Sequence, residues 1–314
     1  MQSGSPHPTH RADWFAARAL QASRRLRPFV PVGVLVFVLA FAAVLVQPER
    51  ILGTPLVVAV PAALILAVVV VFTLAVVLEA RRPTVAHARE VERITGVPAL
   101  GTAFSRHLVR EGSARLRLGA GLDPLRTVYL ALTARGTGAR TVCVTGDDPY
   151  LVAAVAARLG MSAASDERAT LVVDAAPGTA AVTRYFGERH EPGFSEAIAA
   201  VRLWREVARP VGASEALGLD VVPAGARRAD TAASVAIASN RHEFQLFASE
   251  YDFTVIAAPT KGSLASAEML FERPPTIYVA RIARTLLGTL ISEVRDLQQM
   301  NLELYGVLLI DSRF

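Results

Sequence analysis

The chain has 314 residues, with 33 Lys and Arg against 28 Asp and Glu, and a formal net charge of +5 at pH 7. Its single cysteine excludes a disulfide framework and a cysteine-based metal site, and its six histidines lack the spacing of a helical zinc motif. The arginines are spread along the chain and many flank apolar segments, so the positive charge does not indicate nucleic-acid binding.

Two uncharged apolar segments, residues 29–46 and 56–78, follow an N-terminal segment of residues 1–28. At about 1.5 Å rise per residue, the second can cross a hydrocarbon core of about 30 Å, and the first is just long enough. They predict a transmembrane hairpin over residues 29–80. Arginines precede the first span and follow the second, whereas the connector carries one Glu and one Arg. The positive-inside rule therefore places both termini in the cytoplasm.

A cleaved signal peptide and a pair of buried core helices are the alternatives for these segments. A signal peptide is disfavoured because a long leader precedes the first segment and a second apolar segment follows closely. Core helices are disfavoured because buried helices seldom run so far without a polar break.

Residues 81–122 predict a cytoplasmic linker. A polar helix is expected over residues 79–94, with Gly96 and Pro98 ending it. Glycines and mixed charge over residues 102–122 predict a connection without regular structure.

From residue 123 to the end, short β-branched runs alternate with helix-length segments. The runs are apolar on both faces, which favours strands of a covered, mostly parallel sheet. The predicted strands are residues 141–145, 170–174, 220–223, 253–257, 276–282 and 306–310. The predicted helices are residues 151–159, 193–208, 232–249, 264–272 and 284–301. This alternation predicts an α/β fold with a doubly wound sheet, in which ligands bind at the carboxyl ends of the strands.

The first predicted strand ends at Gly146, where a P-loop would lie. A P-loop needs a Lys for the phosphates and a Ser or Thr for Mg²⁺. Counting from Gly146 puts Leu151, Val152 and Ala153 at the Gly, Lys and Ser positions. The intervening residues are Asp147, Asp148, Pro149 and Tyr150. Two carboxylates repel a phosphate and are expected to cap the following helix, so nucleotide binding in the usual manner is not predicted.

Several segments, taken in order, resemble the bacterial tyrosine kinases, P-loop proteins that are fused to or partnered with polysaccharide co-polymerases, also called chain-length determinants. The resemblance rests on residues 91–102 (VERITGVPALGT), 123–127 (DPLRT), 144–149 (VTGDDP), 156–159 (AARL), 171–174 (LVVD), 185–187 (YFG), 251–259 (YDFTVIAAP) and 305–310 (YGVLLI). It implies a sheet of the P-loop NTPase type, as in these kinases and in MinD.

The departures from this family fall on the residues that handle nucleotide. In the family frame, Ala153 and Ala154 take the places of the Lys and the Ser. Ala176 replaces the second Asp of an acidic motif whose first member is Asp174, and Ala257 replaces the Walker B Asp. Asp174 is interpreted as a cap of the following turn, with a remnant Mg²⁺-binding role as the alternative. The family's tyrosine-rich tail and large extracytoplasmic domain have no counterpart in this sequence.

The resemblance with these losses implies a non-catalytic inner-membrane scaffold or regulator of exopolysaccharide or capsule polymerisation and export, with a pseudo-kinase domain and no cofactor or metal. The expected partners are inner-membrane lipid and polysaccharide export or polymerase proteins, in homo- or hetero-oligomers. One alternative is a divergent active kinase or ATPase that uses an unorthodox lysine such as Lys261. Another is a membrane-anchored positioning protein of the MinD/ParA type. Tyr150, Tyr185 and Tyr251 are expected to pack against or flank the sheet rather than accept phosphate.

Overall fold

The structure is a computed structural model that describes residues 84–104, 124–134, 140–211, 218–226, 233–259, 263–264, 274–300 and 302–311. The predicted spans 29–46 and 56–78, half of the predicted linker, and Lys261 lie outside these residues. Within the described ranges, no helix is long and apolar enough to cross a membrane.

Residue contacts group the chain into two units. One comprises Met1–Ala86 with Leu286–Gly288, and within it Thr84 and Leu286 form an isolated antiparallel bridge. The other comprises His87–Thr285 with Thr289–Phe314 and contains all of the described strands.

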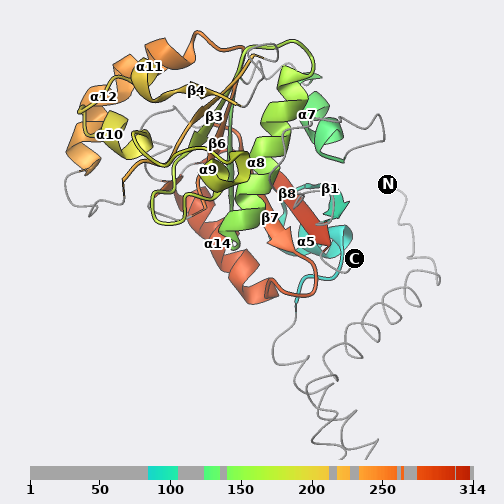
Figure 1. The fold of residues 1–314 in the computed structure, drawn as a ribbon. Helices are drawn as coiled ribbons and strands as arrows, with labels where there is room; N and C mark the ends of the chain where they lie inside the picture. The colour runs from blue at the N-terminus through green and yellow to red at the C-terminus, as the bar shows by residue number, and fades with distance from the viewer. Residues whose placement is uncertain are drawn as a thin grey trace, which may run out of the picture. The chain divides into compact units, whose positions relative to one another are not determined.

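An eight-stranded sheet organises the second unit, in the order β1-β8-β7-β2-β6-β3-β5-β4 (Figure 1). Its strands are β1 (Ala99–Phe104), β2 (Thr141–Gly146), β3 (Thr170–Asp174), β4 (Arg209–Pro210), β5 (Leu219–Val222), β6 (Phe253–Ala257), β7 (Thr276–Arg281) and β8 (Leu304–Asp311). The pairings among these strands are parallel, apart from the edge pair β4–β5. The predicted mostly parallel α/β sheet is therefore confirmed.

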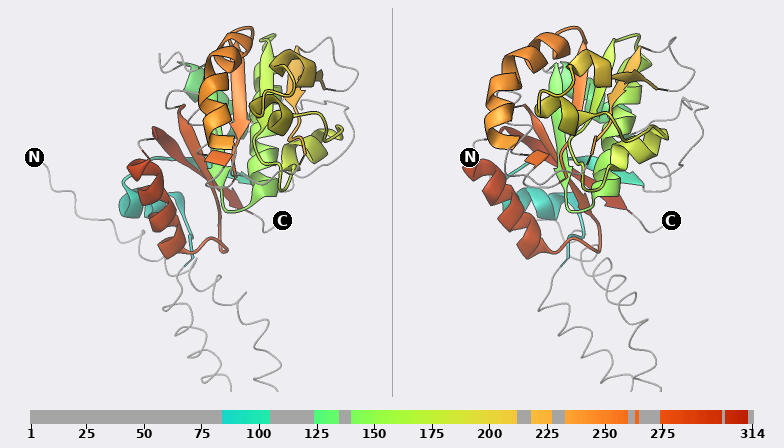
Figure 2. Two further views of the ribbon diagram at one scale, coloured as in Figure 1. Left: turned by 90° about the vertical axis from the view of Figure 1, so that its left-hand side faces the viewer. Right: turned by 60° about the vertical axis from the view of Figure 1, so that its left-hand side comes forward.

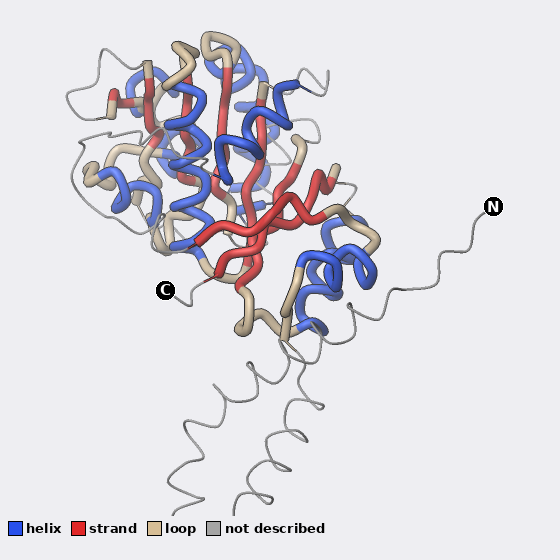
Figure 3. The backbone as a smooth tube through the Cα atoms, turned by 90° about the vertical axis from the view of Figure 1, so that its right-hand side faces the viewer, coloured by secondary structure: helices blue, strands red, loops and turns tan. Residues whose placement is uncertain are grey.

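Helices surround the strands of this sheet (Figure 3), with α8 on one side and α12 and α14 on the other (Figures 1 and 2). The described helices are α5 (Ala88–Thr95), α7 (Pro124–Ala134), α8 (Pro149–Ala164), α9 (Ala181–Phe186), α10 (Phe194–Ile198), α11 (Trp204–Val207), α12 (Ala233–Ala248) and α14 (Leu287–Gln299). This is the doubly wound arrangement that the strand and helix alternation predicts.

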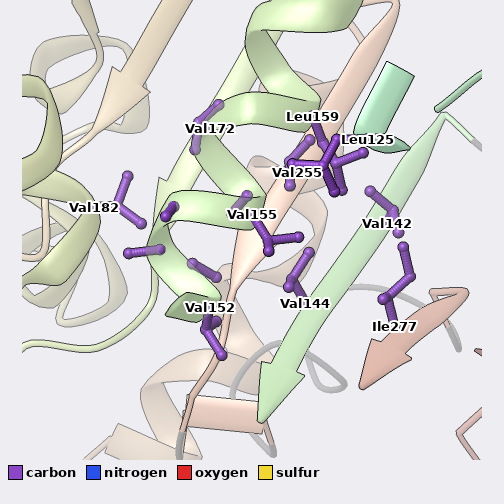
Figure 4. Close-up of a cluster of buried hydrophobic side chains, with 14 of the residues drawn as sticks. Leu125, Val142, Val144, Val152, Val155, Leu159, Val172, Val182, Val255 and Ile277 are labelled. Atoms are coloured by element: carbon purple, nitrogen blue, oxygen red, sulfur yellow. The ribbon is translucent and has the colours of Figure 1, made fainter. Parts of the chain in front are cut away.

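Helix α8 is the central helix of the core. Its side chains are almost all small or apolar because it is buried nearly all round. Val152, Val155 and Leu159 pack against aliphatic side chains of β2, β3 and β6 (Figure 4). Each fully buried aliphatic side chain of this kind contributes about 1.5–3 kcal/mol of transfer free energy.

The chain before the central sheet differs from the sequence prediction. Of the predicted helix 79–94, residues 79–83 lie outside the described residues, 84–87 are not helical, and α5 begins at Ala88; Gly96 ends it as predicted, with φ of 69°. Residues 99–104, inside the predicted linker 81–122, form β1 on the edge of the sheet, so the connection without regular structure does not begin at residue 102 as predicted. The sequence prediction missed β1 because its side chains are mostly half-buried and show no clear alternation.

The predicted helix 193–208 was wrong as a single element. It is broken into α10 and α11, and β4 begins directly after it. Ala200 lies between the two helices with φ of 54°, a left-handed conformation that a continuing helix does not contain. Trp204, only 1% exposed, anchors the second piece in an aromatic cluster with Phe194, Phe244 and Phe247.

Candidate functional site

The carboxyl ends of β2, β6 and β3 lie side by side, since these strands are neighbours in the sheet. Val144 of β2 pairs with Ala257 of β6, which in turn pairs with Asp174 of β3. Three segments that are far apart in the sequence therefore meet at the edge where ligands bind in folds of this class.

The connection from β2 to α8 is very short. The strand ends at Gly146 and the helix begins at Pro149, so that two aspartates alone join them. Asp148 is the N-cap of the helix, and its Oδ1 accepts hydrogen bonds from the backbone N–H of Tyr150 at 3.0 Å and of Leu151 at 3.3 Å. The carboxylate therefore takes the helix N–H groups that a bound phosphate would need.

Both aspartates also contact the end of β7, the strand on the other side of β2. Arg281 Nη1 donates to Asp148 Oδ2 at 2.6 Å, and the two side chains are 21% and 22% exposed. Thr285 Oγ1 donates to Asp147 Oδ2 at 2.7 Å and accepts from the backbone N–H of Arg281 at 2.8 Å. These bonds, which we call the Asp147–Arg281 network, fasten the β2–α8 connection to β7.

The positions that would carry the P-loop Lys and Ser are buried in the core. Val152 is fully buried, and Ala153 and Ala154 are each 2% exposed, within the first two turns of α8. A P-loop places its Lys where the helix begins, next to the phosphates. Here the helix starts at Pro149, before any of these three residues, so the connection is shorter than a phosphate-cradling loop requires.

Asp174 is 1% exposed at the end of β3, and its hydrogen bonds all go to nearby backbone and to Thr183. Its Oδ2 accepts from Thr183 N at 2.9 Å and Thr183 Oγ1 at 2.8 Å, and its Oδ1 accepts from Ala176 N at 3.3 Å. Burial raises the pKa of this carboxyl above its ordinary value, and the hydrogen bonds oppose that shift. The side chain holds the following turn and the first turns of α9, the geometry of a cap.

Ala257 and Ala176 supply no acidic group beside Asp174. Ala257 is 1% exposed, and its carbonyl accepts from Ala175 N at 3.1 Å. In the described part of the chain, no three His, Cys, Asp or Glu side chains gather in a way that could hold a metal ion. Cys143 is fully buried in β2, where burial raises the pKa of its thiol to about 12.

Sequence reasoning missed Arg281 and Thr285. An Arg at the end of a predicted strand gives no signal by itself, and its contact with Asp148 follows from the adjacency of β7 and β2, which the sequence does not show. Two of the three tyrosines that were expected to pack against or flank the sheet are packed, and that none of them accepts phosphate stays a prediction. Tyr185 packs edge-on against Phe186, and Tyr251 donates to Asp220 Oδ2 at 2.6 Å, but Tyr150 is 58% exposed.

No protein-family model matches the chain. It is 26% identical over 190 residues to a protein named "Putative tyrosine-protein kinase EpsB" from Ralstonia nicotianae, and 25% identical over 190 residues to the protein of the same name from Ralstonia solanacearum. The matched residues are 59% of this chain and 25% of each relative. The chain therefore spans about a quarter of the length of these curated relatives.

Solved tyrosine kinase domains share the fold. The BceF tyrosine kinase domain superposes with a TM-score of 0.59 and 19% identity, covering 73% of this chain and 99% of that domain. The kinase domain of the Escherichia coli tyrosine kinase Etk gives a TM-score of 0.59 and 18% identity, covering 73% and 96%. The chain is thus homologous to the EpsB proteins and has the fold of bacterial tyrosine kinase domains, as its motifs predicted.

Proposed function

We propose that this chain is a non-catalytic membrane scaffold or regulator in the polymerisation or export of a bacterial exopolysaccharide or capsule. Its domain with the kinase fold would lie in the cytoplasm and act by binding partners rather than by phosphoryl transfer. The sequence supports the membrane part through residues 29–46 and 56–78, and the kinase homology supports the cellular context.

The observation that carries the non-catalytic part is the Asp148 carboxylate at the start of α8. This carboxylate accepts hydrogen bonds from the first N–H groups of the helix and pairs with the guanidinium of Arg281. Helix N–H groups and arginine side chains are also the groups that bind a nucleotide phosphate. A phosphate entering here would have to displace a carboxylate and would meet a second one on Asp147.

Phosphoryl transfer also needs groups that this edge does not supply. Catalysis of this reaction is almost entirely positioning and charge stabilisation by a Lys, Mg²⁺ ligands and backbone N–H groups. At the matching positions the chain has Ala153, Ala154 and Ala257, each at most 2% exposed. Both carboxylate oxygens of Asp174 accept hydrogen bonds from nearby residues of the fold.

ATP binding by the purified full-length chain tests this proposal. We expect no saturable binding at millimolar ATP with Mg²⁺, and no incorporation of phosphate from labelled ATP into the chain. The Etk kinase domain serves as the positive control in the same titration. Micromolar affinity or autophosphorylation would overturn the non-catalytic assignment, and loss of that activity in Lys261→Ala would identify the unorthodox-lysine alternative.

The polysaccharide role is tested separately, in the organism that carries the chain. Deletion of the gene should lower the amount or change the length distribution of a surface polysaccharide, and a copy with Ala153→Ser should restore it as well as the natural sequence does. Unchanged polysaccharide in the deletion strain would overturn the assignment to that machinery.

A further inference from the structure

Tyr150 differs from the other tyrosines of the chain in exposure. The sequence has six tyrosines, and the structure describes all of them. Tyr129 and Tyr278 are each 2% exposed, and the hydroxyl of Tyr305 is buried. Tyr251 is bonded to Asp220 and Tyr185 is partly buried against the core, whereas Tyr150 is 58% exposed at the second residue of α8. An enzyme that modifies tyrosine can therefore reach Tyr150 without unfolding the sheet.

An arginine from another element already contacts the phenol of Tyr150. Arg184 of α9 places its Nη1 at 3.3 Å from the Tyr150 hydroxyl oxygen, and its guanidinium carbon lies 5.9 Å from the ring centroid. The same guanidinium donates to the carbonyl of Thr179. Arg184 is itself exposed, so its hydrogen-bonding capacity toward a group added to Tyr150 is not spent inside the core.

The side chains of the two aspartates before Tyr150 bond to groups other than its phenol. Asp147 and Asp148 bond to Thr285 and Arg281 at the end of β7, and β7 lies on one side of β2. Tyr150 contacts α9, which follows β3, and β3 lies on the other side of β2. Asp148 also accepts from the backbone N–H of Tyr150, but the charged group that contacts the phenol is the guanidinium of Arg184.

We infer that Tyr150 is a phosphoacceptor site whose phosphate is held by Arg184. In the reaction, the phenol oxygen attacks the γ-phosphorus of a nucleoside triphosphate bound to a separate tyrosine kinase. An O–P bond forms, the bond from the γ-phosphorus to the bridging oxygen breaks, the nucleoside diphosphate leaves, and the phenol proton passes to a base of that kinase. The product is a phosphate ester on the second residue of α8, beside the guanidinium of Arg184. This inference does not depend on whether the chain itself binds ATP.

Mass spectrometry of the full-length chain from its own cells, collected with phosphatase inhibitors during polysaccharide production, tests the acceptor site. We expect phosphate on Tyr150 and on none of the other five tyrosines. Recovery of the Tyr150 peptide in the unmodified form only, or phosphate on a buried tyrosine instead, would overturn the inference. The purified chain incubated alone with Mg²⁺ and ATP separates the two proposals, since phosphate on Tyr150 there would contradict the non-catalytic assignment and leave the acceptor site standing.

The role of Arg184 has its own measurement. Full-length chain carrying phosphotyrosine at position 150 is exposed to a broad-specificity tyrosine phosphatase, and the rate of phosphate release is followed. Arg184→Gln should speed phosphate release several-fold, because the guanidinium no longer holds the phosphate. The release rate of Arg184→Lys should lie between those of the natural chain and Arg184→Gln. Arg189→Gln, an exposed arginine beyond the end of α9, is the matched control and should leave the rate unchanged. Equal rates in all four proteins would overturn the assignment of Arg184.

Discussion

Asp148 does at the start of α8 what a bound phosphate does in a P-loop protein. It accepts from two helix N–H groups and faces a guanidinium, so a side chain of the protein satisfies the helix terminus that a nucleotide would otherwise fill. This cap and the ion pair with Arg281 also join the β2–α8 connection to the end of β7. At the residue scale, the aspartates of this connection therefore make contacts that hold the fold together.

The Asp148–Arg281 pair is predicted to contribute measurably to stability. Removing either partner leaves a charge that is about four-fifths buried, so Arg281→Gln should lower the free energy of unfolding by about 1–3 kcal/mol. Asp148→Ala should cost about 1 kcal/mol more, because the helix also loses its cap. Urea unfolding of the full-length chain and a double-mutant cycle measure both effects.

A more exposed ion pair provides the control for that experiment. Arg126 and Asp166 lie 2.8 Å apart with side chains 46% and 29% exposed, and solvent screening should keep the effect of Arg126→Gln below about 1 kcal/mol. An equal loss from the two arginine substitutions would show that the Asp147–Arg281 network adds nothing beyond a surface ion pair.

Asp174 predicts a pH dependence of stability. Burial raises the pKa of this carboxyl in the folded chain, so the stability it contributes is present below the ordinary Asp value of 3.8 and is lost as the pH rises through the folded pKa. The free energy of unfolding of the natural chain should therefore fall, relative to Asp174→Asn, as the pH is raised from 3.5 to 7. If the free energy of unfolding of the natural chain instead rises with pH relative to Asp174→Asn, the hydrogen bonds from Thr183 and Ala176 outweigh the effect of burial on the pKa.

At the element scale, the β2–α8 connection works because Gly146 lies against β7. A Cβ atom built on Gly146 would be 2.4 Å from the carbonyl oxygen of Val279, a backbone atom that cannot move without shifting the strand. The glycine that resembles the first residue of a P-loop is therefore required here for strand packing, whether or not a phosphate binds.

Gly146→Ala should destabilise the chain by about 2 kcal/mol or more, because β2 and β7 must separate to admit the methyl group. Gly178→Ala is the matched control, since a Cβ at that position would meet nothing within 4 Å. Thermal unfolding of the two variants measures the difference. A tolerated Gly146→Ala would indicate that β2 and β7 adjust more readily than their pairing suggests.

The elements were predictable from the sequence to different degrees. β3 and β6 have the predicted bounds, because a run of β-branched residues between turn residues is a purely local signal. β1 and the break at Ala200 were missed, because an edge strand and a left-handed residue depend on what packs around them. The absence of a Lys and a Ser or Thr after Gly146 at P-loop spacing was visible in the sequence. Arg281 as the partner of Asp148 was not, because the two residues come together only through the order of the strands.

At the scale of the whole molecule, the chain has the fold of bacterial tyrosine kinase domains, and the positions that match the P-loop Lys and Ser are buried in its core. α8 has become an almost entirely buried helix, with apolar residues where a P-loop helix presents polar ones to phosphate and metal. Replacing single residues by those of a P-loop should therefore not produce ATP binding. The short connection and the buried first turns of α8 would both have to change.

Ala153→Lys tests this statement directly. The side chain at this position is 2% exposed, so the lysine would either be buried without a partner or displace the start of α8, at a cost of at least about 3 kcal/mol. We expect a lower melting temperature and no Mg²⁺-dependent ATP binding. Tyr150→Lys places the same charge on an exposed position of the same helix and should stay within about 1 kcal/mol of the natural chain. A gain of ATP binding in Ala153→Lys would show that the connection can open into a phosphate loop, and that the lysine alone was missing.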